Sequence, residues 1–187
     1  MLMLDRSRSA LLVIDMQRAF HTHVPGFFEL VDRAALLVRG ATIMGVPIAV
    51  SQQYPKGLGP TVPGITDALP EDAATFDKLE FSACDAEAWT RDVPAAIRDA
   101  EQFVLVGIEA HVCVRQTALA LLAQGREVFV AVDAVGSRSD LHRDVSLREL
   151  ARASARETTV EQVLFDWLRR AGTQEFKDVQ RLLLDDG

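Results

Sequence analysis

The sequence predicts an α/β fold with three layers, in which helices cover both faces of a mostly parallel, Rossmann-like central sheet of five to six strands. Short apolar runs alternate with helical periods along the chain, which is the pattern of strand–helix–strand units. Runs such as residues 10–15 (ALLVID) and 102–107 (QFVLVG) are almost continuously apolar, as strands buried on both faces are. Several helical periods end at a glycine, as at Gly45 and Gly125, which is a common helix stop.

Each element follows from its local pattern. Strands are expected at residues 10–15, 48–51, 75–77, 102–107 and 127–132. Helices are expected at residues 29–44, 86–100 (in two pieces because of Pro94), 112–124, 140–155, 159–170 and 175–184. Thr159 and Gln162 have the spacing of a capping box. Residues 54–70 are rich in Gly and Pro and are expected to form a long loop of functional interest.

Composition narrows the classes of function. The 187 residues contain 49% hydrophobic and 25% charged residues, show no internal repeat or linker, and are expected to form a single domain over 1–187. The net charge of −7 disfavours nucleic acid and anionic membrane surfaces as partners. No signal peptide or membrane helix is predicted. The two cysteines are therefore expected to be free thiols in a cytoplasmic protein.

Three reactive side chains fall where strands are predicted to end, which is where open parallel sheets carry their sites. Asp15 is either a cap or ion-pair partner, or a general base. Lys78 on its own would be read as a solvated surface lysine. Cys113 follows a strand at the start of a helix, where the helix dipole lowers the pKa of a thiol. Position alone leaves Cys113 open between a nucleophile and a small buried apolar residue.

Other reactive residues give weaker signals. Cys84 lacks a preceding strand and is interpreted as structural. His21 and His23 supply only two potential metal ligands, and His111 beside Glu109 has no further ligand in sequence, so no metal site is predicted. The Gly57-x-Gly59 motif is followed by prolines and does not open a phosphate-binding helix.

Three segments together resemble the isochorismatase-like cysteine hydrolase family, and their order and spacing agree over almost the whole chain. They are LLVIDMQRAF (residues 11–20), DKLEFSAC (residues 77–84) and VGIEAHVCVRQTALALLAQGREVFVAVDAVGSRS (residues 106–139). The segments QYPKGLGPTVP and GIEAHVCV are most similar to the isochorismatase-domain-containing branch of that family.

The resemblance implies a catalytic triad of Asp15, Lys78 and Cys113. Asp15 would take the proton of the thiol, and the ammonium of Lys78 would favour the thiolate. It also implies a non-proline cis peptide bond between Ile108 and Glu109. The backbone N–H groups of Glu109 and Cys113 would then bind a developing oxyanion.

The nicotinamidases of this superfamily carry an Asp-x-His metal motif after the second strand, where this chain has SQQYP (residues 51–55). The expected enzyme therefore uses no metal or other cofactor. It is expected to cleave a C–N bond of a small amide-like substrate in a homo-oligomer, a dimer or tetramer. Candidate substrate contacts are Gln17, Phe20 and Tyr54.

Three alternatives stay open at this stage. A vinyl-ether hydrolase acting on isochorismate would not need the thiol of Cys113. A catalytically silent binding protein on the same fold would keep the thiol without using it. A thiol redox sensor would require Cys84 to approach Cys113.

Overall fold

A single six-stranded sheet forms the centre of the computed structural model, which describes residues 3–185. All neighbouring strands are parallel, and their order is β3-β2-β1-β4-β5-β6. The strands are β1 (Ser9–Ile14), β2 (Ile48–Gln53), β3 (Ala74–Lys78), β4 (Gln102–Ile108), β5 (Glu127–Gly136) and β6 (Arg156–Thr158). The predicted three-layer α/β class, with a sheet of five to six strands, is confirmed.

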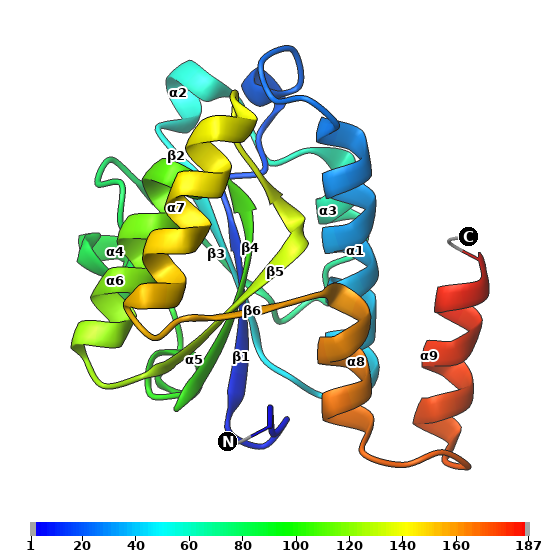
Figure 1. Cartoon of the computed structure of the whole chain (residues 1–187). Helices are drawn as coiled ribbons and strands as arrows, with labels where there is room; N and C mark the ends of the chain where they lie inside the picture. The colour runs from blue at the N-terminus through cyan, green and yellow to red at the C-terminus, as the bar shows by residue number, and fades with distance from the viewer. Residues whose placement is uncertain (1–2, 186–187) are drawn as a thin grey trace.

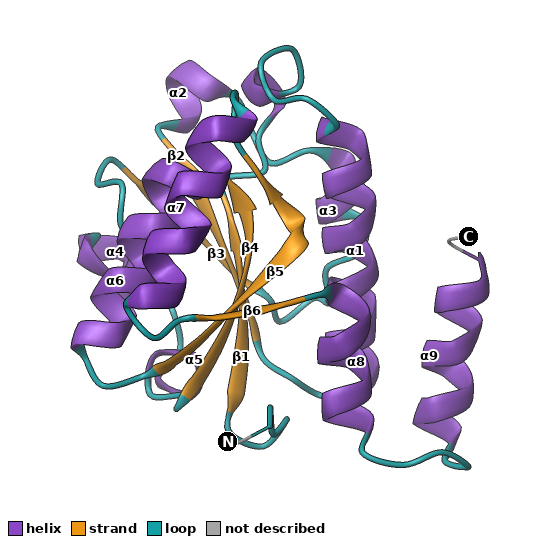
Figure 2. Cartoon of the chain, viewed as in Figure 1, coloured by secondary structure: helices purple, strands orange, loops and turns teal. Residues whose placement is uncertain are grey.

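Helices cover both faces of the sheet (Figure 1 and Figure 2). One layer contains α1 (Phe27–Ile43), α3 (Pro63–Thr66), α8 (Val160–Leu168) and, outermost, α9 (Gln174–Asp185). The other contains α4 (Glu87–Asp92), α5 (Ala95–Arg98), α6 (Arg115–Ala123) and α7 (Asp140–Arg152). The short α2 (Pro55–Leu58) lies at the end of the sheet where the strands finish.

Each face of the sheet supports its own apolar core. Along β1, Leu11 and Val13 pack with the layer of α1 and α8, whereas Leu12 and Ile14 pack with the layer of α4 to α7. Successive side chains of a strand point to opposite faces, so a run that is apolar at every position serves both cores. This explains why the buried strands showed no alternation in the sequence.

Local differences from the predicted elements have simple causes. The chain of residues 54–70 is not one open loop, because Pro55 and Pro63 each begin a one-turn helix, a position that suits proline. The edge strand β6 has only three residues and was not predicted individually. Pro94 separates α4 from α5, as predicted. The capping box of Thr159 and Gln162 is confirmed at the start of α8.

The carboxyl ends of the strands have unusual backbone geometry. Asp15 and Tyr54, which directly follow β1 and β2, have positive φ angles of 50° and 37°, an uncommon conformation for non-glycine residues that concentrates at functional sites. Gly107 in β4 has a φ of 123°, and a Cβ atom there would lie 2.0 Å from the carbonyl oxygen of Ile14. Glycine therefore lets β4 approach β1 directly beside Asp15.

In residues 3–185, no helix combines the length and apolar character that a membrane crossing requires.

Candidate active site

The strand order brings Asp15, Lys78 and Cys113 to one place. Asp15 follows β1, and the neighbouring β4 leads into the turn that carries Cys113. Lys78 ends β3, two strands from β1, and its long side chain passes the end of β2 to reach Asp15. The Lys78 Nζ to Asp15 Oδ2 distance is 2.7 Å. Three residues that are far apart in sequence therefore meet at the edge where parallel sheets carry their sites.

The ion pair of Asp15 and Lys78 is fully buried, since both side chains have 0% exposure. Ser51 Oγ donates a 2.7 Å hydrogen bond to the second carboxylate oxygen, Asp15 Oδ1. Lys78 Nζ also donates to the amide oxygen of Gln53 at 2.7 Å. Buried charges are tolerated only when they are paired and hydrogen-bonded. These contacts show how the fold keeps an ionised pair inside the protein.

Gln53 was missed in the sequence analysis, although it is the last residue of β2. Its amide oxygen accepts from Lys78 and lies 3.9 Å from Cys113 Sγ, while its Nε2 donates to the carbonyl oxygen of Leu79 at 2.8 Å. The rule that sites lie at strand ends would have selected this position. Its uncharged amide gives no signal of reactivity in the sequence, because its role depends on its spatial neighbours Lys78 and Cys113.

Cys113 lies in a π-helical turn, Ala110–Val114, between β4 and α6, with a residue exposure of 6%. Burial, and then the carboxylate of Asp15, raise the pKa of its thiol to about 12, although Lys78 lowers it. The expectation that the helix start and Lys78 would maintain a thiolate is therefore wrong for the resting protein. Burial and the neighbouring carboxylate outweigh the ammonium, and the thiol is protonated at neutral pH.

The turn before Cys113 begins with a cis peptide bond between Ile108 and Glu109, the position implied by the family resemblance. Glu109 is buried, with 4% exposure, and its carboxylate is paired with Arg138 from the segment between β5 and α7. The carboxylate of Glu109 is therefore engaged in an ion pair within the protein.

The three predicted substrate contacts lie in different environments. Tyr54 is 49% exposed and lines a cavity of about 400 Å³ together with Lys78 and Leu79. Phe20 is half-buried and packs against the core under α1. Gln17 is fully buried, and its amide bonds to backbone groups of Gln53 and Gly59. Only Tyr54 presents a large surface to solvent.

The histidines considered as metal ligands are bound to other groups of the protein. The ring nitrogens of His21 and His23 contact the carbonyl oxygens of Arg18 and Ala19, in their own turn. His111 Nδ1 contacts Ser137 Oγ at 3.0 Å. Within the described part of the chain, no three His, Cys, Asp or Glu side chains gather as metal ligands would.

Cys84 is partly buried, and both it and the buried Cys113 are free cysteines. Burial, and then Asp85, raise the pKa of its thiol to about 12.

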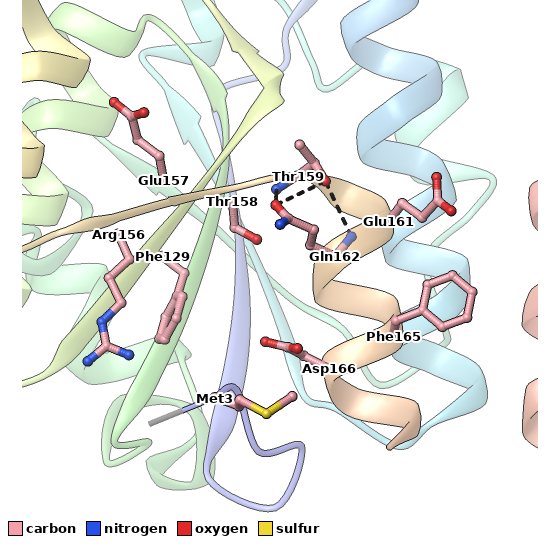
Figure 3. A pocket seen from close by; sticks show the side chains of 10 residues that line it. All are labelled: Met3, Phe129, Arg156, Glu157, Thr158, Thr159, Glu161, Gln162, Phe165 and Asp166. Carbon is pink, nitrogen blue, oxygen red and sulfur yellow. Dashed lines mark hydrogen bonds between the residues drawn. The ribbon is translucent and has the colours of Figure 1, made fainter. Parts of the chain in front are cut away.

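A larger cavity, of about 640 Å³, lies elsewhere, between β6 and α8 (Figure 3). Its lining holds no cysteine, histidine or lysine; the residues are Met3, Phe129, Arg156, Glu157, Thr158, Thr159, Glu161, Gln162, Phe165 and Asp166. This larger cavity is therefore separate from Asp15, Lys78 and Cys113.

Comparison with known proteins shows which family this chain is similar to. The isochorismatase domain family model matches residues 9–162. Isochorismatase domain-containing protein 1 of Danio rerio is 36% identical over 182 residues, which cover 96% of this chain and 62% of that protein. Isochorismatase domain-containing protein 2 of Xenopus laevis is 35% identical, covering 97% of this chain and 86% of that protein. This chain thus spans less than two thirds of the length of the first relative.

Among solved structures, the Caenorhabditis elegans protein described as MAR1 ribonuclease is 37% identical, with a TM-score of 0.91. The match covers 98% of this chain and 93% of that one. The family model covers most of the sequence, and these three proteins are 35–37% identical to the chain over nearly its whole length. The chain therefore belongs to the isochorismatase domain family.

Proposed function

We propose that this protein is a cysteine hydrolase that cleaves a C–N bond of a small amide-like substrate with Asp15, Lys78 and Cys113. The observation that carries the proposal is the buried 2.7 Å ion pair of Asp15 and Lys78. An ion pair without solvent exposure contributes little to stability compared with apolar packing. The pair lies at the strand ends, and both of its charges act on the thiol of Cys113. We therefore infer that the pair serves the reaction of that thiol.

In the proposed mechanism, Asp15 carries the proton through both halves of the reaction. As Cys113 Sγ attacks the substrate carbonyl carbon, the thiol proton moves to the Asp15 carboxylate. The C–N bond then breaks, and the leaving nitrogen takes that proton from Asp15. Water attacks the thioester and gives a proton to Asp15, which returns it to the departing sulfur. A thiol with a raised pKa suits this sequence, because attack and proton transfer occur together.

Lys78 and the backbone supply the electrostatic support. The ammonium of Lys78 stabilises Asp15 as a carboxylate and offsets the negative charge on sulfur. The backbone N–H groups of Glu109 and Cys113 are the proposed donors to the oxyanion of the tetrahedral intermediate. Gln53 holds Lys78 in position through the 2.7 Å hydrogen bond. No cofactor or metal is part of the proposal.

Tyr54 is the proposed aromatic contact to the substrate, because it is exposed beside Lys78. Phe20 is assigned to the wall of the site, supported by its place in the 3-10 turn Arg18–Phe20, which follows Asp15 in the chain. The buried amide of Gln17 bridges the ends of the loops through Gln53 and Gly59. We therefore give Gln17 a role in holding the site together in place of its predicted substrate contact.

We also propose that the protein is cytoplasmic and forms a homo-oligomer, a dimer or tetramer. Two free cysteines support a reducing compartment. Four large apolar side chains are exposed on the segments after β3 and in α7: Leu79, Phe81, Leu141 and Val145. Exposed apolar side chains that gather on a surface are typical of regions that bind another subunit. Light scattering on the purified protein tests the oligomer.

A ribonuclease activity, which the description of the Caenorhabditis elegans protein suggests, is not part of the proposal. The net charge of −7 opposes binding of a phosphate backbone.

The proposal is tested by turnover of a panel of primary amides, carbamates and isochorismate. Wild type, Cys113→Ala and Asp15→Asn are compared. Hydrolysis of an amide or carbamate that both variants lose supports the proposal. Hydrolysis of isochorismate that Cys113→Ala retains and Asp15→Asn loses would replace it with vinyl-ether chemistry. No turnover, together with a Cys113 that alkylates like an ordinary buried thiol, would indicate a silent binding protein.

A further inference from the structure

The turn of residues 109–113, here called the nucleophile turn, is bound tightly by Arg138. The backbone N–H and the Nε of Arg138 both donate to Glu109 Oε1, at 3.0 and 2.9 Å. Its Nη2 donates to the other carboxylate oxygen, Oε2. The guanidinium thus binds the carboxylate with two nitrogens, the geometry that gives arginine its directional strength.

Two more residues of the same turn are bound from the same direction. Ser137 Oγ contacts His111 Nδ1 at 3.0 Å, and Ser146 Oγ donates a buried 2.7 Å hydrogen bond to the carbonyl oxygen of Ala110. Residues 109, 110 and 111 are therefore each fixed by a side chain from the segment between the end of β5 and the middle of α7. Cys113 follows two residues later.

The ion pair of Glu109 and Arg138 is asymmetric. The Glu109 side chain is 4% exposed and the Arg138 side chain is 62% exposed. Burial raises the pKa of the Glu109 carboxyl, but the hydrogen bonds and charge of Arg138 outweigh it and lower the pKa overall. His111 also faces Glu109 and is stacked on His142, with ring centroids 4.9 Å apart. Burial lowers the pKa of His111, so this imidazole is a weak substitute for a permanent cation.

We propose that Arg138 is a positioning residue that acts through the Glu109 carboxylate to hold the nucleophile turn in the conformation presenting Cys113. This role deepens the proposed cysteine chemistry and rests on it. Within residues 3–185 the hydrogen bonds of Arg138 go to Glu109, and none goes to the thiol or to the ion pair of Asp15 and Lys78. Its effect passes through the backbone that carries Cys113 and the two proposed oxyanion donors.

The chain contains a matched control for this pair. Arg115 in α6 binds Glu149 in α7 with two guanidinium nitrogens, through Nε at 2.7 Å and Nη2. Both side chains are partly exposed, at 32% and 44%. Removing Arg115 therefore deletes an ion pair of the same type near the same helices, but leaves no buried carboxylate. A general effect of losing an arginine would appear equally in Arg115→Met and Arg138→Met.

The experiment measures alkylation of Cys113 by iodoacetamide, mapped by mass spectrometry, in Arg138→Met, Arg138→Lys, the double variant Glu109→Gln/Arg138→Met, and Arg115→Met. Arg138→Met is expected to lower the alkylation rate about tenfold, because small displacements of a reacting group are costly. Arg138→Lys restores part of the rate because it keeps the charge but not the planar fork. The double variant restores more than half of the loss on a logarithmic scale, because glutamine leaves no unpaired buried charge and its oxygen can still accept the hydrogen bond from the backbone N–H of residue 138. Arg115→Met matches wild type.

Thermal unfolding tests the ion pair of Glu109 and Arg138 without using the reactivity of Cys113. In Arg138→Met the buried Glu109 carboxyl has a raised pKa, so the folded state binds a proton more tightly than the unfolded state. The melting temperature of Arg138→Met is therefore expected to lie further below that of wild type at about pH 8 than at about pH 5. The double variant lacks this pH dependence, because glutamine does not ionise. If Arg138→Met does not fold, Arg138→Lys and the double variant carry the comparison.

The proposal is overturned if Arg138→Met alkylates like Arg115→Met, or if the double variant is as slow as Arg138→Met with no pH-dependent melting difference. A failure of the cysteine mechanism is recognised separately. In that case wild-type Cys113 supports no turnover in the substrate panel, while the melting comparison still reports whether Arg138 controls the charge of Glu109.

Discussion

The two cysteines of this protein have thiols of similar acidity but very different surroundings. Burial is the first cause of a pKa raised to about 12 at both Cys84 and Cys113. At Cys84 the second cause is the carboxylate of Asp85. At Cys113 a carboxylate and an ammonium act in opposite directions on the thiol. A thiol pKa alone thus does not mark a nucleophile, whereas a base and a cation fixed beside the thiol do.

The largest expected difference between the two regions is in catalysis. Cys113→Ala should lower kcat on an amide substrate by at least about 10³-fold, as loss of a nucleophile does. Cys84→Ala should stay within about twofold of wild type, because the carboxylate of Asp85 acts on the Cys84 thiol without a cation of the kind that Lys78 provides at Cys113. Steady-state kinetics on the substrate from the amide panel measures both variants. Equal losses in the two would remove the distinction between the thiols.

The next difference concerns stability. Lys78→Met leaves the carboxylate of Asp15 buried and without its cation, which should cost about 3 kcal/mol in the free energy of unfolding. Lys56→Met changes an exposed lysine in α2 and should cost less than about 0.5 kcal/mol. Urea denaturation measures both values. Adding Asp15→Asn to Lys78→Met should recover part of the loss, and a double variant less stable than Lys78→Met would contradict a charge-based cause.

A smaller effect is expected at the proposed substrate contact. Tyr54→Ala should raise KM about threefold and leave kcat unchanged, since it removes binding energy common to substrate and transition state. Phe165→Ala removes another exposed aromatic residue, from the cavity between β6 and α8 (Figure 3), and should change neither constant. A KM effect at Phe165 would move the binding site away from the strand ends.

The sequence analysis identified the fold class because buried parallel strands leave continuous apolar runs, such as residues 10–15. It could not define β6, because three residues carry too little pattern to distinguish a strand from a loop. Asp15, Lys78 and Cys113 were selected because each stands at a strand end, and the family resemblance grouped them. Gln53 and Arg138 were not selected, since their importance depends on which side chains lie opposite them in space.

The acidity of Cys113 was the clearest error, and its cause is physical. A position at a helix start predicts a lowered thiol pKa, but this prediction assumes some access to solvent. The depth of burial and the approach of Asp15 are set by the packing of β1 against β4 at Gly107. Such distances follow from the tertiary structure and leave no local sequence signal.

The alkylation rate of Cys113 as a function of pH, in wild type and Asp15→Asn, tests the central claim most directly. Asp15 raises the pKa of the Cys113 thiol and Lys78 lowers it. Removing the carboxylate should therefore lower that pKa and speed alkylation at about pH 8, while turnover is lost with the base. Cys84 in the same sample should alkylate unchanged. An Asp15→Asn protein whose Cys113 titrates like wild type, or whose turnover persists, would contradict the assignment of Asp15 as the base of Cys113.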